Sequence, residues 1–242
     1  AFGLPALWIT EEEREKAEQA GYLVVDPPSI IATHLTGIIK KYASEILGRQ
    51  EVQSILDSLH DKYPAIVDEV KKAVSPGEIQ KVLQNLLKEQ VSIRNMVAIL
   101  ETIVDFSTVS RDVTFLTEKT RQALGRQICL QYADEEKQLN VITINPDIES
   151  KIIESRVETV DGNVPVLDRE FLSSFINAIS NKLMSLKEVN KTIVILCSEE
   201  ARTLVRKCTE RELPGIPVIS ARELTGDIGF EVQGEVDFAL QN

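Results

Sequence analysis

The feature that most constrains the fold is a change in hydrophobic periodicity near residue 138. From 76 to 132 apolar residues recur every three or four positions, which is typical of amphipathic helices. After that point short apolar runs, such as 139–144 and 192–197, alternate with helical segments. We therefore expect a helix-rich mixed α/β (α+β) protein of several small subdomains, with a helical middle block and a C-terminal αβ unit.

The N-terminal part of the chain predicts two helices around a short strand. Thr10 and Glu13 form a capping box for a helix over 11–20, and the apolar run 22–25 indicates a strand. The prolines that follow favour the start of a second helix, because proline is tolerated in a helix's first turn. This helix carries one apolar stripe, which comprises Ile31, Leu35, Ile38, Tyr42 and Ile46. Further apolar residues lie off the stripe, and they fit either a second core contact or an exposed docking groove; these are Ile30, Ile39 and Leu47.

Further elements follow from local signals. Another helix is expected over about 50–60, whereas the stretch 65–70 is ambiguous between strand and helix. Ser75 and Glu78 form a second capping box, and a single helix is expected over about 112–132. In the C-terminal unit we expect a loop at 161–163, a helix over 199–211, and strands at 216–219 and near 228–236.

Composition excludes some functions. The net charge is −11, and no cluster of Lys and Arg offers a surface for phosphates, so we expect no nucleic-acid partner. No run of about eighteen apolar residues could cross a bilayer. The first ten residues lack a starting Met and a basic region, so we expect no signal peptide and a chain cut from something longer. Three widely spaced cysteines indicate reduced thiols in a cytosolic compartment.

No catalytic constellation stands out. Cys197 and Arg202 flank a strand-to-helix turn, as in phosphate-handling thiol hydrolases, but one residue too few separates them. Two glutamates within the turn would also repel a phosphate, so a structural strand end is the favoured interpretation. His34 and His60 share no ligand-like spacing with Cys or carboxylates. We therefore expect no enzyme activity, no cofactor and no metal site.

Several stretches resemble the cytosolic C-terminal region of the FlhA/InvA family of type III export-gate proteins. They are FGLPALWI (2–9), REKAEQAGYLVVDPPSIIATHL (14–35), EILGRQEVQSILD (45–57), IQKVLQNLLKEQVSIRNMVAILETI (79–103) and TRQALGRQI (120–128). The stretches around 24–35 and 48–53 are more similar to the flagellar branch than to the virulence injectisome branch, which remains the alternative. The resemblance implies a discontinuous first subdomain (1–21 and 73–91) interrupted by a second (22–72), then a helical third (92–137) and a C-terminal fourth (138–242).

The resemblance also implies a role. Family members act as a cytosolic docking platform on the cytoplasmic face of the bacterial inner membrane. There they form a nine-membered ring, receive export chaperones loaded with substrates, and work with other components of the export apparatus. The expected function is thus delivery of flagellar substrates to the export gate, without catalysis and without a cofactor.

The family's chaperone groove maps onto the boundary between the first two subdomains. The implied lining comprises Asp26, Pro28, Ile30, Thr33, His34, Ser44, Leu47, Arg49, Gln50, Glu78 and Val82. Ser44 and Leu47 occupy positions where some members carry an acidic and an aromatic residue, so chaperone preference is expected to differ. We expect Leu47→Asp to weaken binding of a chaperone–substrate complex and to leave the fold intact.

Overall fold

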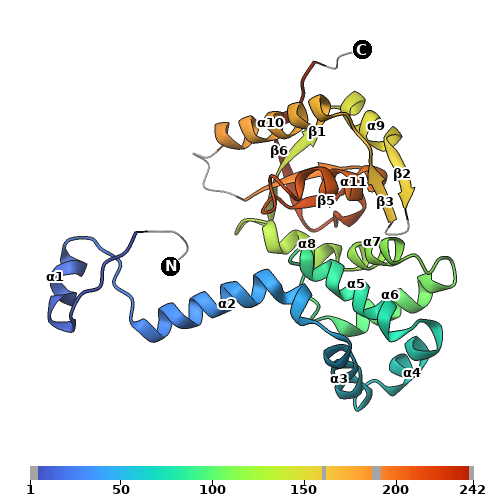
Figure 1. The fold of residues 1–242 in the computed structure, drawn as a ribbon, viewed down its shortest axis with the longest axis horizontal. Helices are drawn as coiled ribbons and strands as arrows, with labels where there is room; N and C mark the ends of the chain where they lie inside the picture. Colours follow the sequence, from blue (N-terminus) through green and yellow to red (C-terminus); the bar gives the residue numbers. More distant parts are fainter. Residues whose placement is uncertain (1–4, 160–161, 187–191, 240–242) are drawn as a thin grey trace.

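A computed structural model describes residues 5–159, 162–186 and 192–239 and divides them into an arm and a body (Figure 1). The arm contains a short 3-10 helix, η1 (Glu11–Glu13), then α1 (Arg14–Gln19) and the long α2 (Pro27–Ile46). Figure 1 shows that α2 leads away from the body and that α1 lies beyond its far end. The predicted capping box is confirmed, since the Glu13 carboxylate accepts the Thr10 N–H at 2.9 Å.

The strand predicted at 22–25 is wrong. These residues are irregular, and Tyr22 and Leu23 are largely exposed. Their β-forming side chains become a strand only when a neighbouring strand accepts their backbone hydrogen bonds, and the described part of the arm offers none. The start of the second helix is confirmed, because Asp26 caps α2 by accepting the Ser29 N–H at 3.1 Å.

A block of helices forms the middle of the chain. Its elements are α3 (Arg49–His60), α4 (Pro64–Ala73), α5 (Pro76–Lys88), α6 (Met96–Ser107), α7 (Val113–Ala123) and α8 (Gly125–Tyr132). The ambiguous stretch 65–70 is helical, within α4. The single helix expected over 112–132 is two helices that meet at Leu124. Gly125 permits this junction: a Cβ there would lie 2.4 Å from the Glu223 carbonyl oxygen of the C-terminal unit.

The C-terminal unit alternates strands and helices, as predicted. Its elements are β1 (Gln138–Ile144), α9 (Pro146–Glu154), β2 (Arg156–Thr159), β3 (Gly162–Pro165), α10 (Arg169–Ser185), β4 (Ile193–Cys197), α11 (Glu199–Thr209), β5 (Val218–Ser220), η3 (Ala221–Glu223) and β6 (Gly229–Val236). Four strands form a parallel sheet in the order β5-β4-β1-β6.

A small antiparallel hairpin was not predicted. Strands β2 and β3 pair with each other outside the main sheet. Part of the expected loop at 161–163 belongs to this hairpin, because Gly162 and Asn163 lie in β3. Asp161 lies outside the described residues. The strand expected at 216–219 begins only at Val218, and α11 ends at Thr209.

The two faces of the sheet pack against different partners. On one face, Val141, Val194 and Ile219 belong to the same core as the helical block. On the other, Ile142, Ile195 and residues of α9, α10 and α11 form a second core. The alternation follows from the two-residue period of strands. A continuous core therefore crosses the predicted boundary at 137/138, and the predicted division into four subdomains stays a prediction.

Candidate docking surface

The exposed surface of α2 is its most unusual feature. No residue within this helix is buried. The apolar stripe predicted from the sequence faces solvent together with Ile39; we call this set the α2 face, and it comprises Ile31, Leu35, Ile38, Ile39, Tyr42 and Ile46, each at least 40% exposed. Contiguous exposed apolar surface of this kind marks an interaction site in soluble proteins.

The root of α2 is anchored to the body by hydrogen bonds and by a buried side chain. The Leu47 carbonyl, just beyond the helix, accepts hydrogen bonds from the side-chain amides of Gln80 (3.1 Å) and Gln84 (2.9 Å) on α5. The Leu47 side chain is 7% exposed and belongs to the core of the helical block. Backbone and side chain together fix the direction in which α2 leaves the body.

One group of the predicted site residues lies at the far end of α2. Asp26 caps the helix, and hydrogen bonds from Ser29 hold the pKa of its carboxyl below the ordinary value. Pro28, Thr33 and His34 are exposed, and Ile30 is half-buried.

A second group lies at the root. Arg49 and Gln50 are exposed at the start of α3, and Ser44 is half-buried. The Arg49 guanidinium lies close to Gly77 in the first turn of α5, 3.7 Å from where a Cβ there would stand. The remaining two predicted residues lie on α5. Glu78 is half-buried in its first turn, and Val82 is fully buried in the next turn.

The predicted residues therefore do not form one compact pocket. With 20 residues and about 1.5 Å per residue, α2 is about 30 Å long, so Asp26 and Leu47 lie at opposite ends. Two of the expected lining residues, Leu47 and Val82, point into the core. The burial of Leu47 argues against the expectation that Leu47→Asp leaves the fold intact, and we now expect this substitution to destabilise the protein. What joins the two groups is the α2 face between them.

A buried ionic cluster joins the helical block to the C-terminal unit, and sequence reasoning missed it. The guanidinium of Arg202 on α11 donates to Glu118 on α7 and to Glu89 after α5, the latter at 2.8 Å. Arg121 on α7 pairs with Glu89 (3.2 Å) and with Glu223 (2.8 Å). Burial raises the pKa of Glu118, whereas for Glu89 the two guanidinium groups outweigh burial and lower the pKa. No local motif predicts the cluster, because its members are widely separated in sequence.

This cluster also explains why the turn between Cys197 and Arg202 is structural. The Arg202 side chain is 1% exposed and makes four hydrogen bonds to two carboxylates, so it is not available to a phosphate at the turn. The Cys197 thiol is buried, donates to the Ile219 carbonyl at 3.9 Å, and has a pKa raised chiefly by burial. A nucleophilic cysteine needs a lowered pKa and access, and this one has neither.

The remaining chemistry of the described residues is sparse. No cluster of three or more His, Cys, Asp or Glu side chains among them could hold a metal ion. Across the ranges 5–159, 162–186 and 192–239, no helix is both long and apolar enough to span a bilayer.

Comparison with known proteins identifies the class. The model of the FHIPEP family matches residues 1–229, so the chain belongs to that family. The chain is 47% identical to the flagellar biosynthesis protein FlhA of Borreliella burgdorferi and 41% identical to that of Bacillus subtilis, with 98% of the chain covered in each case. It spans 34% and 35% of their lengths, which is about a third of each protein.

Solved structures give the same answer for the fold. The Chlamydia pneumoniae CdsV protein superposes with a TM-score of 0.87 at 27% identity, covering 98% of this chain and 68% of that one. The nonameric SctV-C of EPEC superposes with a TM-score of 0.81 at 30% identity, covering 93% of this chain and 68% of that one. The fold is therefore that of type III export-gate proteins, and the predicted family and fold class are confirmed.

Proposed function

We propose that this chain is a docking platform of the bacterial flagellar type III export apparatus. Its α2 face receives an apolar helix of an export chaperone that carries its substrate, and the complex is then passed toward the membrane export gate. The observation that carries the proposal is the exposed apolar face of a helix whose root is anchored to the body.

The geometry supports helix-in-groove recognition. The α2 face repeats with the spacing that an amphipathic partner helix can match. Polar groups border it at both ends, with Asp26, Thr33 and His34 near the start and Ser44, Arg49 and Gln50 near the root. In this arrangement the predicted lining residues orient the partner, and the apolar face supplies most of the affinity. Fast release suits a surface that handles many clients in turn.

The flagellar branch is favoured by sequence similarity. Identity is 41% and 47% to two FlhA proteins, against 29% to the low calcium response locus protein D of Yersinia pestis over 96% of the chain. A role in a virulence injectisome is the second candidate, and the superposition on CdsV and SctV-C supports it at the level of the fold.

The relatives support a proposal for the assembly and location of this chain. SctV-C is nonameric, and we propose a nine-membered ring for this chain in its full-length context. We propose that the ring lies at the cytoplasmic face of the inner membrane, where other export-apparatus components are its partners. Nucleic acid is not among the proposed partners. No catalytic step is part of the proposal, and no cofactor is required.

Calorimetric titration with flagellar chaperone–substrate complexes from the same organism tests the proposal. Leu35→Asp and Ile39→Asp, at positions 51% and 57% exposed, should weaken binding at least about tenfold, because each removes roughly 1.5 kcal/mol or more of apolar burial. Val109→Asp is the matched control, since Val109 is an exposed valine in the loop between α6 and α7. Equal affinities for all three variants and the wild type would remove the α2 face from the site.

A further inference from the structure

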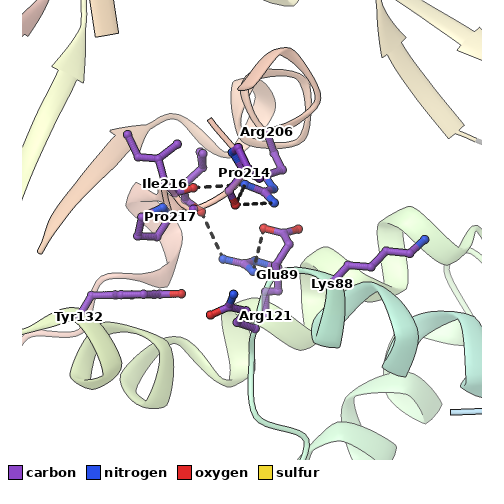
Figure 2. Close-up of a pocket in the computed structure, with 11 residues that line it drawn as sticks. Lys88, Glu89, Arg121, Tyr132, Arg206, Pro214, Ile216 and Pro217 are labelled. Carbon is purple, nitrogen blue, oxygen red and sulfur yellow. Dashed lines mark hydrogen bonds and ion pairs between the residues drawn. The ribbon is translucent and has the colours of Figure 1, made fainter. Parts of the chain in front are cut away.

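A basic cleft lies on the side of α2 that faces the body. One part of it is lined by Lys40 and Lys41 of α2, Lys88 at the end of α5, and Arg206 and Pro214 from the C-terminal unit. A second part runs deeper and shares Lys88, Arg206 and Pro214 with the first. Figure 2 shows this inner part, with Arg206, Glu89 and Arg121 close together, Tyr132 at one side and the Lys88 side chain extending away from them. The two parts adjoin at these shared residues, and we call them together the basic cleft, which the sequence did not predict.

The charge of this cleft opposes that of the molecule. The chain carries a net charge of −11, yet the side chains of four cationic residues gather here from three elements, namely Lys40, Lys41, Lys88 and Arg206. Within the described residues, none of these four forms an ion pair with a carboxylate. The acidic group in the lining is Glu89, and its carboxylate is already taken by Arg121 and Arg202.

The inner part offers donors whose positions are fixed. The Arg206 guanidinium is held by the Ile216 carbonyl at 3.2 Å and by the Pro214 carbonyl at 3.5 Å. At the floor, Arg121 is 2% exposed, and its Nε has no hydrogen-bond partner among the described groups. A buried donor without an acceptor costs about 1–3 kcal/mol, so the described acceptors leave one donor of this guanidinium unsatisfied beneath this part of the cleft.

We propose that this cleft binds an acidic peptide segment of a partner protein, with carboxylates placed against Arg206 in the inner part and against Lys40, Lys41 and Lys88 in the part beside α2. The proposal does not depend on the chaperone role of the α2 face. It gives α2 two separate surfaces: an apolar one that binds a partner helix and a basic one that binds an acidic peptide segment.

A peptide fits the cleft better than a large anionic partner. A nucleic acid or an anionic membrane would bring many charges near the whole surface, whose net charge repels them. A short acidic segment senses mainly the charges within about 8 Å, the screening length at physiological salt, and these are the cationic side chains of the cleft. Carboxylates also match the forked donors of arginine.

Fluorescence anisotropy with a labelled ten-residue peptide of alternating Glu and Ser tests the inference, with the corresponding Gln–Ser peptide as the neutral probe. The double variant Lys40→Gln, Lys88→Gln should weaken binding of the Glu–Ser peptide at least about fivefold at low salt, and added salt should shrink this difference. The double variant Lys62→Gln, Lys72→Gln changes the net charge equally at two exposed lysines outside the cleft, and it should bind as the wild type does.

The outcomes separate the alternatives. Loss of binding in the cleft variant alone supports the inference. Equal affinity of both double variants, or equal binding of the Glu–Ser and Gln–Ser peptides, overturns it. Two further results would overturn the assignment to a peptide. One is displacement of the Glu–Ser peptide by inorganic phosphate when phosphate and peptide carboxylate are at equal concentrations. The other is tighter binding of the protein to vesicles of anionic lipid than to the peptide. Chaperone titrations with the same variants are read separately, so failure here leaves the role of the α2 face untouched.

Discussion

The two junctions of this molecule are built in opposite ways. Where the helical block meets the C-terminal unit, a hydrophobic core is shared and the largely buried Arg202 and Arg121 are paired with carboxylates. Where α2 leaves the helical block, Leu47 alone enters the core and the apolar face beyond it is open to solvent. The first junction pairs most of its charged groups internally. The second leaves apolar surface exposed.

This difference assigns separate tasks to the two regions. A junction with buried, mutually paired charges disfavours sliding, because any displacement would leave a charge desolvated and alone. A helix held only at its root can present its face at a defined angle and still exchange partners. Under the proposed function, the body fixes the geometry and the arm provides recognition. The predictions below test this contrast, beginning with the largest effect.

Breaking the ionic cluster should have the largest effect. Arg202→Met leaves the Glu118 and Glu89 carboxylates buried without their main partner, and we expect a loss of about 3–5 kcal/mol in the free energy of unfolding. Urea denaturation measures it. Arg126→Met is the control, since the Arg126–Asp227 pair is exposed and should be worth about 1 kcal/mol or less. Similar costs for the two variants would contradict the role given to the cluster.

The root of α2 should come second. Leu47→Asp places a carboxylate in the core, and we expect a loss of about 2–5 kcal/mol, as for removal of a buried leucine. Ile46→Asp is its control, because Ile46 is 56% exposed next to it. In thermal denaturation, the midpoint temperature should be lower for Leu47→Asp than for the wild type and nearly unchanged for Ile46→Asp. The reverse order would mean that α2 is held by its face and not by Leu47.

The smallest effect should be that of a cap at the same junction. The Glu78 carboxylate accepts the Ser75 N–H at 2.7 Å, and hydrogen bonds with Ser75 lower its pKa below 4.5. A lowered pKa in the folded state stabilises the protein above the unfolded value, and this contribution is lost as pH falls through the folded value. Glu78→Gln should therefore cost about 0.5–1 kcal/mol at pH 7.

The difference between wild type and Glu78→Gln should shrink as the pH falls below about 4.5. Denaturation at several pH values measures it. A cost that is unchanged at low pH would show that the charge of Glu78 has no part in capping α5.

Much of the fold could be predicted because its signals are local. Capping residues such as Thr10, Asp26 and Ser75 start helices where expected, and the buried runs of β1 and β4 form strands. The run 22–25 failed because strand formation depends on a partner, which local sequence does not report. The break at Leu124 was missed. It lies next to Gly125, which packs closely against the Glu223 carbonyl, and a contact between residues so far apart in the chain leaves no local signal.

The candidate site was predictable in its parts and not in its arrangement. The stripe beginning at Ile31 follows from helical spacing, but periodicity cannot say whether a stripe faces a core or solvent. The buried position of Leu47 and the length of α2 separate residues that the resemblance had grouped. The basic cleft and the ionic cluster depend on contacts between distant elements, so their members carried no signal in the sequence.

Hydrogen–deuterium exchange tests the central claim most directly. Amide exchange along the chain is compared with and without a saturating flagellar chaperone–substrate complex. We predict slowed exchange concentrated in α2, from Ile31 to Ile46, with α11 in the body unchanged. Unchanged exchange in α2 together with protection elsewhere in the body would contradict the account.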